Sequence, residues 1–440
     1  MISICRIQSF PTTSGVNEAH GNVKIIIFMN GLGLGGTEKA ACRWAWGLKE
    51  RGHNVTVLSL SDGPRRAGLE QRVVPLKIVP AEPSAIADAL REIAPDVIHA
   101  HAPGHPHEGD ALGDALKVLP KIPVVQTNVF GHLYHPGEDA WTDFRLFISW
   151  TSCVQAARRS FRKLDEDFFR RASVAVYPVD PVEPATADEI AAFRKQLGVA
   201  DDEVLFGRLS RPEPNKWTNL ALDAFQKALR GNRKIKLLLR EPPPLVAEKL
   251  RASPDADRFV ILPATADAGE LRLTMSVLDV VLHTSLIGES FGYGIAEPMN
   301  LGKPVITHSV PWQDQAQIEL VRHGECGFVA STPATMADAI LTLTNDAALR
   351  RKFGAAARQH IRALAHPDTS IARLEAVLRA AVERRDNPFA AEDVERARAT
   401  AAYLDTHQFG HYLLEQLALR PFYYRVRFHE WRKHIQFVRG

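Results

Sequence analysis

Short apolar runs alternate with amphipathic stretches through the first half of the chain. The apolar runs predict strands at residues 23–29, 55–60, 97–100, 124–126, 145–149 and 174–177. The stretches between them predict helices at residues 37–50, 85–93 and 111–119. Thr37 is placed to cap the first of these helices. Such alternation is typical of parallel strands joined by crossover helices.

The same alternation restarts after residues 178–186, a proline-rich and acidic stretch that we interpret as a linker. Further strands are predicted at residues 204–208, 236–239, 259–262, 277–282 and 304–307. Further helices are predicted at residues 188–197, 220–229, 333–343, 347–364 and 369–384. Two successive units of this kind predict an α/β protein with two Rossmann-like, doubly wound domains and a cleft between them.

The chain is long enough for more than one domain, because its 440 residues exceed what one hydrophobic core usually organises. We assign residues 1–22 to a frayed polar extension and residues 23–180 to an amino-terminal domain. Residues 181–385 form the second domain, and residues 386–440 a helical carboxyl-terminal tail. The tail mixes aromatic and basic side chains. Two interpretations of it stay open: peripheral attachment to an anionic membrane surface, or packing back on the amino-terminal domain.

Composition excludes several classes of protein. No apolar run approaches the roughly 18 residues of a membrane span, and residues 1–23 lack the charged-then-apolar order of a signal peptide. The four cysteines have no metal-ligand spacing and fit reduced thiols in a cytoplasmic protein. The net charge is +3, yet residues 420–440 alone hold six Lys or Arg against one Glu. The rest of the chain therefore has no basic surplus for nucleic acid.

The most informative segment spans residues 288–306, which follow the apolar run at 278–282. It places Glu289 and Glu297 on either side of a glycine-rich turn that leads into a helix start. Exposed amides at a helix start favour an anion. Carboxylates accept hydrogen bonds from sugar hydroxyls. The segment therefore predicts a site for a molecule that is part phosphate and part sugar.

A basic loop follows the first predicted strand of the second domain. Arg208, Arg211 and Lys216 lie in it, and two prolines stiffen it. Ligands collect at the carboxyl ends of strands in an open α/β sheet, so we expect these cations to reach toward the cleft. Arginine forks match phosphate oxygens, and lysine adds a point charge. The alternative is a solvated basic turn without a ligand.

Residues 31–36 contain the pattern G-x-G-x-x-G between a predicted strand and a predicted helix. Alone, this pattern favours a dinucleotide-binding domain, which requires an acidic residue at the end of the second strand. Asp62 is the one candidate, and it lies beyond that strand in a turn. We therefore rank a loop that faces phosphate or sugar first, a turn that binds nothing second and a dehydrogenase third.

Four histidines lie within nine residues, at positions 99, 101, 105 and 107. Zinc binding is one interpretation, but no carboxylate or thiolate frames them. We favour a loop that lines the cleft, in which His101 polarises a group or binds sugar; a solvated loop is the alternative. Asp255 and Asp257 imitate a metal-binding D-x-D, although the Ser-Pro before them favours an exposed turn. We predict no metal site.

Together these motifs resemble those of GT-B glycosyltransferases of family 4, the group 1 glycosyltransferases. Glu289 and Glu297, with seven residues between them, resemble the E-x7-E motif of that family. Residues 31–39 resemble its amino-domain glycine loop, and residues 207–216 resemble its Arg…Lys diphosphate clamp. The three motifs follow the family's order within residues 23–385. The resemblance implies a GT-B fold, in which two Rossmann-like domains face an interdomain cleft.

The resemblance also implies how the leaving group is held. Arg208 and Lys216 would neutralise the donor diphosphate, and the amides of Phe291 and Gly292 would add donors to it. The clamp carries an insertion, so Arg211 is the alternative arginine. Preorganised cations and amides of this kind stabilise the negative charge that departs in the transition state.

By the same resemblance, Glu297 would hold the ribose hydroxyls and Glu289 would face the donor sugar and the reaction centre. Gly35 and Gly36 would let the backbone of the first domain approach the donor. The acceptor side departs from the family pattern. The family has a histidine after the strand that ends near residue 127, where this chain has Asn128, with His132 further on. The candidate catalytic groups are therefore Glu289, His101 and Asn128.

The resemblance implies a metal-independent, retaining hexosyltransferase, as in polysaccharide biosynthesis. It would move a sugar from a nucleotide-diphosphate sugar to a glycan, lipid or small-molecule acceptor and would need no other cofactor. The expected location is the cytoplasm, with the basic tail able to contact the inner face of the membrane. The alternatives are a GT-B nucleotide-sugar epimerase or hydrolase and a non-catalytic sugar-nucleotide binding module. An NAD-dependent oxidoreductase is a distant fourth.

Overall fold

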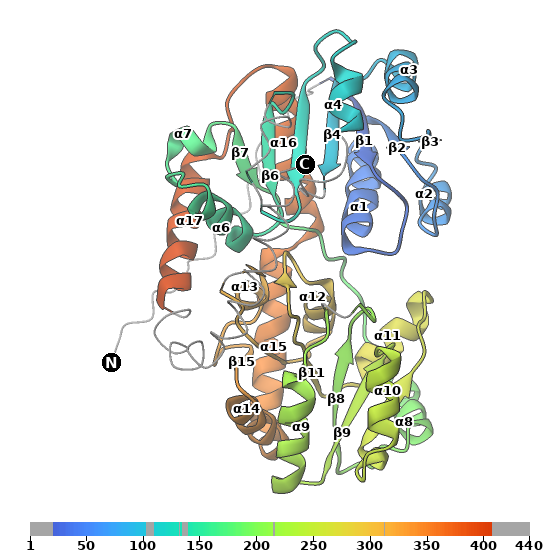
Figure 1. The fold of residues 1–440 in the computed structure, drawn as a ribbon, viewed down its shortest axis with the longest axis vertical. Coiled ribbons are helices and arrows are strands. Elements are labelled where there is room, and N and C mark those ends of the chain that lie inside the picture. The colour runs from blue at the N-terminus through green and yellow to red at the C-terminus, as the bar shows by residue number, and fades with distance from the viewer. Residues whose placement is uncertain are drawn as a thin grey trace, which may run out of the picture.

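The computed structural model describes residues 21–102, 110–131, 133, 140–213, 216–311 and 313–406. The predictions for residues 1–20, for His105, His107 and His132, and for residues 407–440 lie outside the described part of the chain. The described residues form two parallel β-sheets with helices on both faces, one in the upper and one in the lower half of Figure 1.

The first sheet has seven strands in the order β3-β2-β1-β4-β5-β6-β7, and all of its pairings are parallel. The strands are β1 (Lys24–Met29), β2 (Asn54–Ser59), β3 (Leu76–Ile78), β4 (Val97–Ala102), β5 (Val124–Asn128), β6 (Phe144–Phe147) and β7 (Ala172–Val174). The helices are α1 (Gly36–Glu50), α2 (Arg66–Gln71), α3 (Pro83–Ile93), α4 (Ala111–Leu116), α6 (Trp150–Arg159) and α7 (Glu166–Phe169). This is the Rossmann-like unit that the alternation predicts.

The second sheet has six parallel strands in the order β10-β9-β8-β11-β13-β15. They are β8 (Val204–Leu209), β9 (Ile235–Arg240), β10 (Phe259–Leu262), β11 (Val280–Leu282), β13 (Val305–Thr307) and β15 (Gly327–Val329). Two-residue strands β12 (Gly288–Glu289) and β14 (Asp314–Gln315) pair outside this sheet. The helices are α8 (Ala187–Gln196), α9 (Leu220–Gly231), α10 (Pro244–Arg251), α11 (Ala268–Val277), α12 (Tyr293–Asn300), α13 (Gln317–Leu320), α14 (Pro333–Asn345) and α15 (Ala347–Leu364).

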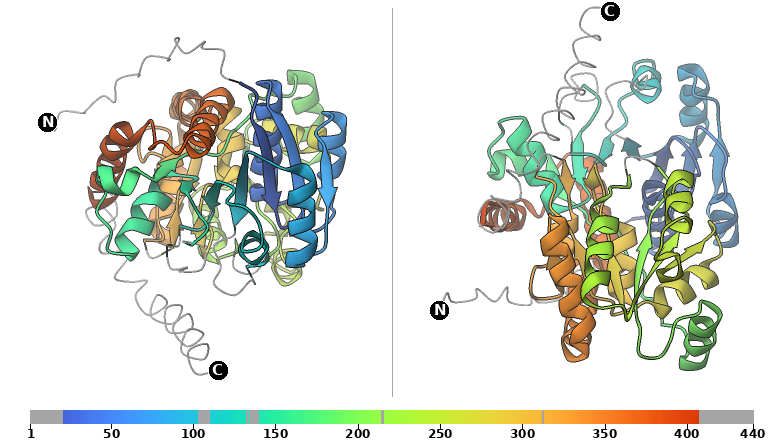
Figure 2. Two further views of the ribbon diagram at one scale, coloured as in Figure 1. Left: turned by 90° about the horizontal axis from the view of Figure 1, so that it is seen from above. Right: turned by 60° about the horizontal axis from the view of Figure 1, so that its bottom comes forward.

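The chain then returns to the first domain. Helix α16 (Pro367–Val382) packs on α1, β4 and β5, and α17 (Ala390–Asp405) packs on α6, α7 and β7. The two red helices accordingly lie beside the upper domain (Figure 1, Figure 2). Trp44 on α1 donates to the hydroxyl of Ser370 on α16 at 2.9 Å. The return therefore begins at α16, before the boundary that we set at residue 385.

Several helices begin at a polar residue whose side chain caps the first turn. Thr186 and Glu189 form a reciprocal capping box at the start of α8, and Thr332 and Thr335 form one at α14. The predicted cap at Thr37 is wrong. Helix α1 begins at Gly36 with Gly35 at the N-cap position and no side-chain cap. The glycine backbone at this end is left uncovered by a capping side chain.

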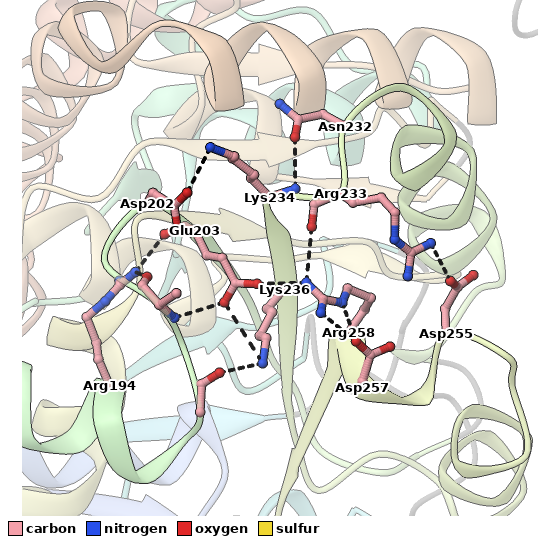
Figure 3. A network of polar contacts seen from close by, with 12 residues as sticks. Arg194, Asp202, Glu203, Asn232, Arg233, Lys234, Lys236, Asp255, Asp257 and Arg258 are labelled. Atoms are coloured by element: carbon pink, nitrogen blue, oxygen red, sulfur yellow. Dashed lines mark hydrogen bonds and ion pairs between the residues drawn. The ribbon is translucent and has the colours of Figure 1, made fainter.

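An ion-pair network joins the amino ends of β8 and β9 (Figure 3). Because β8 and β11 are parallel, this is the opposite end of the sheet from the E-x7-E segment, which follows the carboxyl end of β11. Glu203 accepts from Arg258 at 2.7 Å and from the amide of Ala200 at 2.9 Å. Asp257 pairs with Arg258, and Asp255 pairs with Arg233 at 2.8 Å. The two aspartates that imitate a D-x-D motif are therefore part of a structural network around the short 3-10 helix Ala256–Arg258.

Candidate active site

The E-x7-E segment runs from strand β12 into helix α12, beyond the carboxyl end of β11. Gly292 is the N-cap of α12 and has φ +101° and ψ 65°, a left-handed conformation that side chains other than glycine rarely adopt. Phe291 before it is 3% exposed. Because the first amides of a helix have no partner within it, those at the start of α12 are available to an anion.

Glu289 is largely buried, with 14% of its side chain exposed, and it lies between the side chains of Lys216 and His283. Its Oε1 accepts from Lys216 Nζ at 3.0 Å and lies 3.1 Å from His283 Nε2. Burial alone would raise the pKa of Glu289, but Lys216 and His283 outweigh it and lower the pKa to about 2. Its Oε2 has no partner among the described residues. Glu289 is therefore an ionised carboxylate with one oxygen free to accept.

Of the two clamp arginines, Arg208 is the buried one. It is 0% exposed at the end of β8, and its guanidinium donates to Thr284 Oγ1 at 2.9 Å and to the carbonyl of Lys216 at 2.6 Å. It also stacks over the Trp217 ring at 4.3 Å. Burial lowers the pKa of Arg208 to about 9. Arg211 is exposed and pairs with Glu213 at 2.8 Å.

Arg208 and Lys216 occupy different positions in the site. Both terminal nitrogens of Arg208 are bound by the protein, and its Nε is buried without a partner in the described structure. Arg208 therefore braces the loop that carries Lys216, while the Lys216 ammonium itself lies against Glu289 and the carbonyl of Gly288. The Arg211 side chain pairs with Glu213, and the Arg211 carbonyl accepts from the Trp217 indole at 2.6 Å.

The second carboxylate of the motif meets the other domain. Glu297 on α12 forms an ion pair with Lys39 on α1, and the Lys39 ammonium lies 5.0 Å from the centre of the Tyr293 ring. A Cβ at Gly36 would lie 3.1 Å from the Tyr293 ring, so this glycine permits close approach of α1 and α12. The side chain of Glu38 occupies the space beside Gly35.

The glycine loop lacks the acidic partner of a dinucleotide site. Asp62, the one candidate, is exposed and bound to Arg66 at 2.6 Å and to the amide of Gly63 at 2.7 Å. These local bonds lower the pKa of Asp62, the Arg66 hydrogen bond most of all. The loop therefore faces the second domain without the carboxylate that a dehydrogenase would use for ribose.

On the acceptor side, His101 and Asn128 lie on the adjacent strands β4 and β5, where Ala102 pairs with Asn128. Both residues are buried. Burial lowers the pKa of His101 to about 3, so its imidazole is neutral at pH 7. Neither ring nitrogen has a hydrogen-bond partner within the described chain. His101 stacks on Tyr177, whose ring lies 5.7 Å from that of Phe291. His101 is thus linked to the donor loop through the Tyr177 ring.

His99 does not join His101 at a metal site. Its Nε2 lies 2.6 Å from Thr127 Oγ1, and burial together with His101 holds its pKa well below the usual range. In the described structure, no three His, Cys, Asp or Glu side chains lie together in a way that could hold a metal ion. None of the described helices is long and apolar enough to cross a membrane.

Sequence reasoning missed two residues that bind the motif carboxylates and one that joins the two domains. His283, the residue after β11, binds Glu289, and Lys39 binds Glu297. Glu319 of the second domain accepts from the amide and hydroxyl of Thr151 at 2.9 and 3.1 Å, at the start of α6 in the first domain. The position of His283 directly after strand β11 could have indicated it, because ligands bind at the carboxyl ends of such strands. Lys39 and Glu319 act across the domain junction and leave no local signal.

Two protein-family models match the sequence of this chain. The glycosyl transferase 4-like domain matches residues 35–196, and the glycosyl transferases group 1 model matches residues 202–346. Together they cover most of the described chain, and each falls on one of the two sheets. The chain belongs to the group 1 glycosyltransferases, and its two domains form a GT-B fold. The predicted family and fold class are thereby confirmed, and the protein is a glycosyltransferase.

Solved structures agree on the fold. HepE of Anabaena, in complex with UDP and glucose, is 19% identical with a TM-score of 0.64, over 82% of this chain and 100% of that one. A Rickettsia africae glycosyltransferase is 14% identical with a TM-score of 0.69, over 82% and 99%. The catalytic domain of starch synthase IV from Arabidopsis thaliana, bound to ADP and acarbose, is 12% identical with a TM-score of 0.62, over 82% and 100%. No curated protein sequence gives a significant match.

Proposed function

We propose that this protein is a retaining hexosyltransferase that moves a sugar from a nucleotide-diphosphate sugar to a glycan or lipid-linked acceptor. The observation that carries the proposal is the partly buried Lys216–Glu289 pair beside the start of α12. A cation, free helix amides and a carboxylate with one open oxygen stand together there, which suits the junction of a diphosphate and a sugar. The UDP-bound and ADP-bound neighbours support a nucleotide donor.

The donor groups have distinct tasks in this proposal. The anomeric carbon–oxygen bond breaks with its electron pair on the diphosphate. The acceptor hydroxyl oxygen forms the new bond at the anomeric carbon, and its proton passes to the departing diphosphate oxygen. The Lys216 ammonium and the amides of Phe291 and Gly292 stabilise the charge that the diphosphate gains. Glu289, whose pKa is about 2, stays ionised and accepts hydrogen bonds from the donor sugar. Glu297 accepts from the ribose hydroxyls.

On the acceptor side we propose Asn128 and the neutral imidazole of His101. The two side chains lie on neighbouring strands at the carboxyl edge of the first sheet, the edge at which such folds bind ligands. His101 stacks on Tyr177, which lies against Phe291 of the donor loop. Gly35 and Gly36, in the same domain as His101 and Asn128, let the start of α1 approach the donor.

The test is release of nucleoside diphosphate from UDP-, GDP-, ADP- and dTDP-sugars, with and without a panel of glycan and lipid-linked acceptors. We expect release that depends on an acceptor, and a product whose anomeric proton coupling in NMR matches that of the donor. Since Lys216 supplies the positive charge, EDTA is expected to leave the rate unchanged. Release without an acceptor would favour a hydrolase, and binding without release a non-catalytic module; either result contradicts transfer.

A further inference from the structure

One face of helix α12 is bound to the first domain and the linker. Tyr293, Glu297 and Asn300 are spaced at i, i+4 and i+7 and so share one side of the helix. Tyr293 Oη donates to the carbonyl of Pro178 at 3.0 Å, and Asn300 donates to the carbonyl of Asp180 at 2.9 Å. Glu297, between them, binds Lys39 of α1. The carboxylate expected to hold ribose is therefore also a contact between the domains.

Lys39 is an unusual residue at its position. It lies near the amino end of α1, where the helix dipole disfavours a cation. No partner other than Glu297 and the Tyr293 ring is found for it among the described residues, and both belong to the other domain. The glycine at residue 36 brings the start of α1 against Tyr293. The sequence thus places a lysine where only the opposite domain gives it a stabilising contact.

The two carboxylates of the motif are held in the same way. Lys216 and His283 both bind Oε1 of Glu289, and Lys39 binds Oε1 of Glu297. In each case Oε2 has no partner within the described chain. A lysine on one oxygen fixes the orientation of the carboxylate and leaves the other oxygen as an acceptor. Lys216 comes from the domain of its carboxylate, whereas Lys39 comes from the opposite domain.

We propose that Lys39 is a positioning residue for the nucleotide, which orients Glu297 toward the ribose only while α1 and α12 are in contact. Nucleotide affinity then depends on the first domain, although the ribose carboxylate belongs to the second. This inference rests on the proposed function of Glu297 and adds a residue to it. Since the pair is partly exposed, its effect is modest: about 1 kcal/mol, or roughly fivefold in Kd.

The test is calorimetric titration of the full chain with UDP and 2′-deoxy-UDP, with ADP and GDP in parallel. Lys39→Met is expected to weaken UDP binding roughly fivefold and to reduce the preference for UDP over 2′-deoxy-UDP. Because Lys39 acts through Glu297, the double variant Lys39→Met/Glu297→Gln should bind no more weakly than Glu297→Gln alone. Lys49→Met, at the other end of α1, is the matched control and should bind as the unaltered protein does.

Three results would overturn the inference. The first is unchanged UDP affinity in Lys39→Met. The second is tighter UDP binding in Lys39→Met, which would mean that Lys39 blocks the nucleotide site. The third is additive losses of affinity in the double variant, which would indicate that Lys39 contacts the diphosphate directly. If the unaltered protein bound none of the nucleotides, the proposed function would fail as well. The two failures are thus distinguishable, and thermal unfolding of each variant verifies that it is folded.

Discussion

Lys216 and His283 donate to one oxygen of the partly buried Glu289 carboxylate, and this arrangement decides what Glu289 can do. With a pKa of about 2, Glu289 holds no proton at neutral pH and cannot act as a general acid. It can accept a hydrogen bond and stabilise developing positive charge. Single residues at this site are therefore expected to act through fixed charge.

Replacement of Lys216 removes the cation nearest the proposed diphosphate. We expect Lys216→Met to lower kcat by about 10²–10³-fold, because one preorganised group that stabilises a leaving charge contributes about that much. The measurement is steady-state release of nucleoside diphosphate in the presence of acceptor. Lys227→Met on the exposed face of α9 is the control. A rate within a factor of two of the unaltered protein would show that Lys216 does not face the leaving group.

Glu289 also links stability to pH. Its folded pKa of about 2 lies below its ordinary value of 4.5, so ionised Glu289 stabilises the fold above about pH 4.5. That contribution is lost progressively as the pH falls from 4.5 toward 2. The Tm difference between the unaltered protein and Glu289→Gln should therefore shrink as the pH is lowered from 5 to 3. A difference that is constant or grows over this range would contradict the assignment.

At the scale of elements, the sequence predicted most of the strands and of the longer helices, because their apolar periodicity is strong, but not helices α2, α6, α7, α10, α11 and α13. It did not indicate strands β12 and β14, since two residues show no period, yet their pairing sets Glu289 beside Gln315 and Asp314. Helix α12 was recognised only as a helix start. Its sharp entry through Gly292 depends on a backbone conformation that the letter Gly allows but does not specify.

The entry of α12 provides a prediction at this scale. Gly292 has φ +101°, so Gly292→Ala should lower the free energy of unfolding by about 1–2 kcal/mol and misplace the helix amides. Chemical denaturation measures the first effect and nucleotide titration the second. Gly68→Ala is the matched control. It lies in α2 with nothing within 4 Å of its added methyl group, and it should be neutral or stabilising.

For the whole molecule, alternation along the chain was enough to predict two Rossmann-like domains in sequence. It was not enough to show how they meet. Lys39 and Glu297 are 258 positions apart, and neither residue has a local pattern that indicates the other. Helix α16 was predicted as a helix, but an amphipathic pattern shows only that one face is buried and not which domain covers it. Its packing on α1 and β4 had to come from the structure.

The central claim is that a nucleotide-sugar donor binds at the carboxyl edge of the second sheet, against α12 and the start of α1. Hydrogen exchange with UDP, GDP or ADP tests it most directly. We predict slower exchange at Gly288–Glu289, in α12 and at the amino end of α1, with no change around Glu203 and Arg258 at the opposite end of the strands. Slower exchange around Glu203 and Arg258, or no change in exchange with any of the nucleotides, would contradict this claim.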